Sequence, residues 1–174
     1  MRSEALEKAL APYAAFEDGK RLRAGFTTGT TAAAAALAAA TLLFSGERLE
    51  AVSIRTPVGA VLPIPIESLE LVTEAGAVSA VAAVRKDAGD DPDVTDGLLF
   101  YARVDTEESA GTESSEETEI PVVFRAGPGI GTVTKPGLDQ PVGEAAINRV
   151  PRNMIAAAVR SAYRESGLKS LPDT

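Results

Sequence analysis

The sequence predicts an α+β domain in which an alanine-rich helix and a C-terminal helix pack on a mixed, mostly antiparallel sheet. The chain has 174 residues, of which 45% are apolar, and this is enough to bury one core. Its middle part carries apolar residues at strand spacing, whereas segments near both ends have helical spacing. Strands do not alternate with helices, so a parallel nucleotide-binding fold is not expected.

Three segments are expected to be helical because they combine apolar spacing with start and stop residues. They are 3–16, a short helix or a loosely docked arm that begins at Ser3 and is interrupted by Pro12; 32–44, which begins after Thr30 or Thr31 and ends at Gly46; and 151–165, which begins at Pro151 or Arg152 and ends near Gly167. Alanine has the highest helix propensity and a small side chain, so segment 32–44 is suited to close packing on a sheet or a second helix.

The strands are expected between these helices. Segments 51–56 and 60–66 alternate apolar and polar residues around a Pro-Val-Gly turn, which predicts a hairpin. Because Pro63 and Pro65 lack a backbone N–H group, the second strand should lie at an edge. Further strands are expected at 78–85, 97–104 and 120–125.

Composition excludes several classes of chemistry. The sequence has no Cys and no His, which rules out disulfides, thiolate or imidazole metal ligands, cysteine nucleophiles and Ser-His-Asp triads. The formal charge of −8 comes mainly from segment 105–119, which we expect to be a solvated acidic loop. Nucleic-acid binding is disfavoured, since the bases are scattered and aromatic residues are few.

Targeting features are also not evident. No strongly apolar stretch reaches the roughly 18 residues of a membrane span, so a soluble protein without membrane association is expected. The N-terminal residues lack the charge and cleavage pattern of a secretory signal, which favours a cytoplasmic location.

Two of the four segments that could carry chemistry lie at expected helix starts. Segment 25–31, Gly-Phe-Thr-Thr-Gly-Thr-Thr, presents hydroxyls and backbone N–H groups that favour an anionic ligand group, or it is simply a capped helix start. Segment 143–155 places Arg149 and Arg152 beside Pro151. These arginines are either carboxylate clamps or a solvated basic helix end.

The other two segments are expected to be loops. Segment 86–97, KDAGDDPDVTDG, concentrates five carboxylates. They suit either a hard cation such as Mg²⁺ or Ca²⁺, although the spacing does not fit an EF-hand, or a turn in which they cap backbone groups and hold Lys86. Segment 127–137 has glycines at alternate positions and Lys135, which indicates either close approach of a ligand or an ordinary glycine-rich loop.

These four segments together resemble the CbiD family. The matching motifs are TTGTTAAAAA at 27–36, KDAGDDPDVTDG at 86–97, GIGTVTKPGL at 129–138 and PVGEAAINRVPRNMI at 141–155. The resemblance implies methyl transfer from S-adenosylmethionine to carbon C-1 of cobalt-precorrin-5B, giving cobalt-precorrin-6A during anaerobic cobalamin synthesis. Where family members usually carry Cys and His, this chain has Thr31 and Asp96.

The resemblance also implies a substrate-binding site, because the corrinoid carries several carboxylates that call for cationic and hydroxyl donors. We expect no metal site and name no catalytic residue. The expected substrate contacts are Thr27, Thr28, Gly29, Thr30, Asp90, Asp91, Asp93, Thr95, Gly129, Gly131, Lys135, Asn148, Arg149 and Arg152.

The same resemblance predicts the domain organisation. Residues 1–174 would form the N-terminal domain of the family, with a family-like core at 22–166, and the C-terminal family domain would be absent from this chain. An alternative function is then a non-catalytic corrinoid-binding or scaffold half that needs a C-terminal partner or forms a homo-oligomer.

Overall fold

The computed structural model describes residues 2–107, 120–137 and 139–168. The helices and strands are α1 (Glu4–Leu10), the 3₁₀ turn η1 (Ala11–Tyr13), β1 (Ala15–Glu17), β2 (Lys20–Leu22), α2 (Thr28–Ser45), β3 (Ala51–Arg55), β4 (Val61–Pro65), β5 (Ser68–Glu74), β6 (Ala77–Arg85), β7 (Leu99–Asp105) and α3 (Arg149–Ser166). All strand pairs are antiparallel, in the order β1-β2, β3-β4 and β5-β6-β7.

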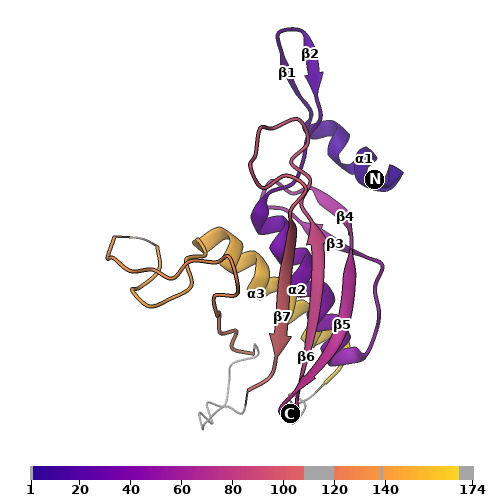
Figure 1. The fold of residues 1–174 in the computed structure, drawn as a ribbon. Coiled ribbons are helices and arrows are strands. Elements are labelled where there is room, and N and C mark those ends of the chain that lie inside the picture. The colour runs from indigo at the N-terminus through magenta and orange to yellow at the C-terminus, as the bar shows by residue number, and fades with distance from the viewer. Residues whose placement is uncertain (1, 108–119, 138, 169–174) are drawn as a thin grey trace.

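Helix α2 is the central element of the fold. It packs against the β5-β6-β7 sheet on one side and against α3 on another, as Figure 1 shows, and it also contacts β3. By length and composition α2 could cross a membrane, but 67% of that stretch is buried inside the protein. A helix that is apolar on all sides is typical of a core helix in a fold of this kind.

The buried residues form two clusters on different sides of α2. In the main cluster, alanines such as Ala34, Ala35 and Ala38 face the sheet and the β3-β4 hairpin. The second cluster lies between α2 and α3, where the rings of Phe44 and Tyr163 meet edge to face with centroids 5.6 Å apart. The small alanine side chains allow α2 to approach both neighbours closely.

The structure confirms the predicted fold class and most of the predicted elements. The α+β architecture, the 51–65 hairpin with its prolines on an outer strand, and the helix that ends at Gly167 are all present. Ser3 caps α1 by accepting a hydrogen bond from the N–H group of Leu6 at 3.2 Å. The predicted acidic loop lies largely at 108–119, outside the described residues.

Two predictions about helix and sheet boundaries were wrong. Helix α2 begins earlier than predicted, because Thr27 and not Thr30 or Thr31 is its N-cap. The expected single sheet is divided into separate antiparallel sheets, since β3 and β4 pair only with each other among the described strands.

The predicted strand at 120–125 does not form a ladder. Ile120, Val122 and Phe124 are half-buried at alternate positions, as a strand would be. However, Ile120 and Val122 pack against the second cluster, and the carbonyl of Ile120 accepts a hydrogen bond from Arg160 Nε at 3.1 Å. The segment is therefore bound to α3, not to the edge of β7.

The structure also contains a hairpin and a strand that were not predicted. Strand β1 of the hairpin occupies the end of segment 3–16, where helical structure was expected, since α1 ends at Leu10. The β1-β2 hairpin turns at Asp18-Gly19, with φ values of 48° and 75° that are typical of a type I′ turn. Strand β5 enters a similar turn at Ala75-Gly76, with φ values of 51° and 89°. An Asp-Gly pair is a strong hairpin signal, whereas Ala-Gly is a weak one.

Candidate functional site

The N-terminal ends of α2 and α3 lie side by side. A Cβ atom on Gly29 would lie 3.1 Å from Pro151 Cγ, so the glycine permits this close approach. Figure 1 shows that both helices begin on the same side of the molecule. Because the N-terminus of a helix carries partial positive charge, the two ends together favour an anionic group nearby.

The threonines at the start of α2 have different environments. Thr27 Oγ1 accepts a hydrogen bond from the N–H group of Thr30 at 3.2 Å, and the two hydroxyl oxygens lie 3.0 Å apart. Thr30 is 1% exposed, and the buried Thr31 hydroxyl donates to the Thr27 carbonyl at 2.9 Å. Only Thr27 and Thr28 of these residues are exposed to solvent.

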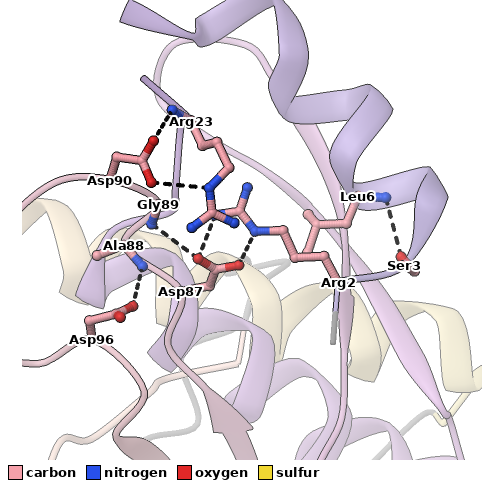
Figure 2. Close-up of polar contacts among 9 residues, drawn as sticks. All are labelled: Arg2, Ser3, Leu6, Arg23, Asp87, Ala88, Gly89, Asp90 and Asp96. Carbon is pink, nitrogen blue, oxygen red and sulfur yellow. Dashed lines mark hydrogen bonds and ion pairs between the residues drawn. The ribbon is translucent and has the colours of Figure 1, made fainter. Parts of the chain in front are cut away.

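The acidic turn 86–97 packs directly on the chain that leads into α2. A Cβ atom on Gly25 would lie 2.1 Å from the Ala88 carbonyl carbon, and one on Gly89 would lie 2.2 Å from the Arg23 carbonyl oxygen. The N–H group of Phe26 donates to the Asp87 carbonyl at 2.8 Å. The two segments therefore approach backbone to backbone, as Figure 2 shows.

Four carboxylates of this turn have protein partners. Asp87 forms a bidentate ion pair with Arg2, and Asp90 accepts from the N–H group and Nε of Arg23 at 2.9 and 3.1 Å. Figure 2 shows both arginines directed into the turn. The remaining two pairs are Asp93 with Lys86, at 2.5 Å, and Asp96 Oδ1 with the N–H group of Ala88, at 2.8 Å.

These partners lower the pKa values of three carboxyl groups. The Lys86 ammonium, helped by the Thr95 hydroxyl and N–H group, holds the pKa of Asp93 well below its usual range. The N–H group and guanidinium of Arg23 lower the pKa of Asp90. Burial alone would raise the pKa of Asp87, but its hydrogen bonds to Arg2 and to the Gly89 N–H group lower it overall.

The geometry therefore supports the structural interpretation of this turn. Lys86 is 2% exposed, and its ammonium neutralises Asp93 inside the turn. No group of three or more acidic side chains that could hold a metal ion occurs among the described residues. Four residues of this segment were expected to contact the substrate. Asp90, Asp93 and Thr95 form hydrogen bonds within the protein, whereas Asp91 is exposed.

The glycine-rich loop pairs with the segment before α3. The N–H group of Ala146 donates to the Gly131 carbonyl at 2.8 Å, and that of Val133 donates to Glu144 at 2.9 Å. Gly129 has a φ of 84°, which favours glycine at this position. Lys135 is exposed in the same loop.

The two arginines at the start of α3 differ in their contacts. Arg152 donates to the carbonyls of Ile147 and Ala145 at 3.1 and 2.9 Å, and its guanidinium lies 4.8 Å from the centroid of the Phe124 ring. Its side chain is 15% exposed. Arg149 and Asn148, by contrast, are exposed.

The four sequence-predicted segments are thus linked by pairwise contacts. The acidic turn packs on the chain that leads into α2, Gly29 of α2 approaches Pro151 of α3, and the glycine-rich loop pairs with the segment before α3. Six of the predicted residues have exposed side chains that form none of the ion pairs described above, and two predicted glycines are also exposed. They are Thr27, Thr28, Asp91, Lys135, Asn148 and Arg149, with Gly129 and Gly131. Arg2 and Arg23, which neutralise the acidic turn, were not predicted. The only indication in the sequence that these two residues bind the acidic turn was their positive charge.

A groove of about 420 Å³ was also not predicted. It lies between α2, the end of β3 and α3, and its lining residues are Leu37, Ser53, Ile54, Arg55, Thr56, Pro57, Asn153, Met154, Ala157, Ala158 and Ser161. Because these residues come from three distant segments, no local pattern could have revealed it.

Comparison with known proteins gives consistent results. The sequence profile of the CbiD family matches residues 15–171. The chain is 49% identical over 144 residues to a cobalt-precorrin-5B C(1)-methyltransferase of Treponema denticola, and 47% identical over 146 residues to one of Pseudomonas putida. These matches cover 82% and 84% of this chain, but 37% and 36% of the relatives.

A solved structure shares the fold. The crystal structure of a cobalamin biosynthesis protein (cbiD) from Archaeoglobus fulgidus is 30% identical with a TM-score of 0.61. The match covers 96% of this chain and 48% of that chain. By the coverages given above for the two methyltransferases, the chain spans about a third of the length of the curated relatives. The chain belongs to the CbiD family.

Proposed function

We propose that this chain forms the substrate-holding part of a cobalt-precorrin-5B C(1)-methyltransferase. The proposed overall reaction transfers a methyl group from S-adenosylmethionine to carbon C-1 of cobalt-precorrin-5B and gives cobalt-precorrin-6A. The observation that supports this most strongly is the 49% identity over 144 residues to a methyltransferase with this substrate in its name.

The proposed contact site is the surface around the adjacent starts of α2 and α3. The substrate carries acetate and propionate carboxylates, which require cationic or hydrogen-bonding partners. Thr27 and Thr28 offer exposed hydroxyls at the start of α2, and Arg149 offers a guanidinium at the start of α3. Lys135 adds a second exposed cation, and both helix termini favour negative charge.

Four other predicted residues would act indirectly. Gly29 allows α3 to approach, Thr30 completes the cap of α2, and Gly131 binds the segment before α3. Arg152 fixes that same segment through the carbonyls of Ala145 and Ile147. They hold the exposed donors in place, which is the way a rigid scaffold lowers the entropic cost of orienting a substrate.

The absence of His and Cys is compatible with this role. The acceptor is a carbon of an electron-rich macrocycle, so the reaction requires no activated side-chain nucleophile. The cobalt ion is part of the substrate. The protein must mainly orient the ring, and orientation can contribute several kcal/mol of barrier reduction, on the order of 7–11 in the best cases.

The groove and the acidic turn offer few partners for the methyl donor. A carboxylate is one common partner for the ribose hydroxyls and the amino group of such a donor, and no acidic side chain lines the 420 Å³ groove. The carboxylates of the acidic turn are mostly paired with cations. We therefore assign no donor-binding residue in this chain.

A second candidate is a corrinoid-binding half without activity of its own. It is favoured by the length comparison, since the chain covers 37% of the Treponema denticola relative. The two candidates differ only in whether this chain by itself catalyses methyl transfer.

Incubation of this chain with methyl-labelled S-adenosylmethionine and cobalt-precorrin-5B separates the two candidates. Transfer of label to the corrinoid would place the donor site within this chain. Binding of the corrinoid, followed by absorbance in the same sample, without transfer of label would support the binding half. Absence of both would contradict the proposed function.

A further inference from the structure

The two-stranded β3-β4 sheet has two unlike edges. The N–H group of Thr56 donates to Ala60 at 2.8 Å, and that of Ile66 donates to Glu50 at 2.9 Å. In an antiparallel pair, every second residue directs its backbone groups to the partner strand. Ser53 and Arg55, which lie between these positions, therefore direct their N–H and C=O groups away from β4.

The outer edge of β4 is blocked, whereas the outer edge of β3 is not. Pro63 and Pro65 pair with Ser53 and Ala51, so their missing N–H groups belong to the outer edge of β4. Proline at such positions prevents another strand from adding to the sheet. Strand β3 carries no proline, and among the described strands β4 is its only partner.

The open edge of β3 borders the 420 Å³ groove. Residues from Ser53 to Pro57 line one side of the groove, and no residue of β4 does. Met154, Ala157 and Ala158 of α3 line the other side, and Leu37 of α2 also contributes to the lining. Open backbone groups beside a mainly apolar surface are the features that bind an added strand.

The groove also interrupts the packing around α2. This helix is apolar on all sides and is covered by the sheet, the hairpin and α3, but Leu37 remains only half-buried where the groove opens. Covering an apolar surface of this kind is favourable at roughly 25 cal/mol per Å².

We propose that the groove binds an extended polypeptide segment as a third strand beside β3, and that this segment belongs to the part of a CbiD-family protein that this chain does not span. The relatives provide the length for it, since this chain covers 37% and 36% of theirs. The row of open backbone donors and acceptors fits a strand better than a small ligand. This inference concerns assembly and does not depend on methyl transfer.

The test uses overlapping fluorescent peptides that together cover the Pseudomonas putida relative outside the stretch matched by this chain. Each peptide is titrated with the purified 174-residue chain, and fluorescence anisotropy reports binding. For a peptide that binds, amide hydrogen exchange of the chain is measured with and without it. We expect at least one apolar, alternating peptide to bind and to protect the amides of Ser53 and Arg55.

Two variants and a matched control locate the binding surface. Ser53→Pro removes one outward N–H group and places a ring against the added strand, and Ala157→Arg fills the groove from α3. Val61→Pro is the control, because Val61 pairs with Arg55 and its N–H group lies on the blocked edge of β4. Circular dichroism and thermal unfolding establish that each variant is folded.

The expected result is an affinity loss of about tenfold or more in both groove variants and a change below about twofold in Val61→Pro. The inference is overturned if no peptide binds, or if Ser53→Pro and Val61→Pro bind equally. It is also overturned if light scattering shows that the chain alone forms a dimer that Ser53→Pro dissociates, since a second copy would then occupy the edge.

Discussion

Replacing Gly89 by alanine should destabilise the fold much more than the same change at Gly97. The two glycines lie in the same turn, and both have a φ of 73°. They differ in their surroundings, because a Cβ atom on Gly97 meets nothing within 4 Å, whereas one on Gly89 would lie 2.2 Å from the Arg23 carbonyl oxygen. The pair therefore separates backbone strain from the close approach of the two segments.

The magnitudes follow from these contacts. Gly97→Ala should cost about 1 kcal/mol, the usual penalty for a left-handed conformation in a residue with a side chain. Gly89→Ala adds a clash that forces the turn away from segment 23–26. The hydrogen bonds from Phe26 to Asp87 and from Asp90 to Arg23 would then be lost or lengthened, at about 1 kcal/mol each. The expected total is about 3 kcal/mol.

Gly25→Ala provides an independent check of the close approach. Gly25 does not have a positive φ, so its alanine variant tests the clash alone, with a Cβ atom 2.1 Å from the Ala88 carbonyl carbon. The expected loss is about 2 kcal/mol, between the losses of the other two variants.

Urea unfolding monitored by circular dichroism measures these differences in unfolding free energy, and thermal unfolding measures the corresponding shifts in Tm. At about 2–4 °C per kcal/mol for a chain of this size, Gly89→Ala should lower Tm by about 10 °C and Gly97→Ala by about 3 °C. Equal losses for Gly89→Ala and Gly97→Ala, or an unchanged stability for Gly25→Ala, would refute the close packing of the turn on the start of α2.

Two further predictions concern neighbouring residues. Arg152→Ala should lower the free energy of unfolding by about 1–3 kcal/mol, because the carbonyls of Ala145 and Ile147 lose their donor. Replacing the exposed Arg149 by alanine should change it by no more than about 0.5 kcal/mol. Equal effects of the two variants in urea unfolding would contradict this assignment. The pKa of Asp93 lies below its ordinary value of 3.8 in the folded state, so its ionised form stabilises the fold above about pH 4, and this contribution is lost as the pH falls through the lowered pKa. Asp93→Asn should therefore reduce the loss of stability between about pH 4 and pH 2, and an unchanged slope of unfolding free energy against pH would show that the Lys86 pair has no such role.

Local patterns in the sequence were sufficient for most of the elements. The alanine run of α2, the alternation around the Pro-Val-Gly turn and the stop at Gly167 each depend on neighbouring residues only. The N-cap of α2 was wrong because several consecutive threonines can cap a helix, and only the burial of Thr30 and Thr31 distinguishes Thr27.

Long-range contacts explain what the patterns did not reveal. Segment 120–125 has the alternation of a strand, but its apolar residues contact α3. The partners of the acidic turn, Arg2 and Arg23, lie more than sixty positions away in the sequence from the carboxylates that they bind. Likewise, each of the four segments was found from its residues, but their convergence depends on contacts such as that of Gly29 with Pro151.

The most direct test of the proposed substrate-holding role is a binding titration of the purified chain with cobalt-precorrin-5B, monitored by the absorbance of the corrinoid. Arg149→Ala serves as the site variant, and Arg48→Ala serves as a distant exposed control. The proposal predicts saturable binding that Arg149→Ala weakens about tenfold and the control leaves unchanged. Absence of binding, or equal binding by both variants, would contradict a substrate site at the paired starts of α2 and α3.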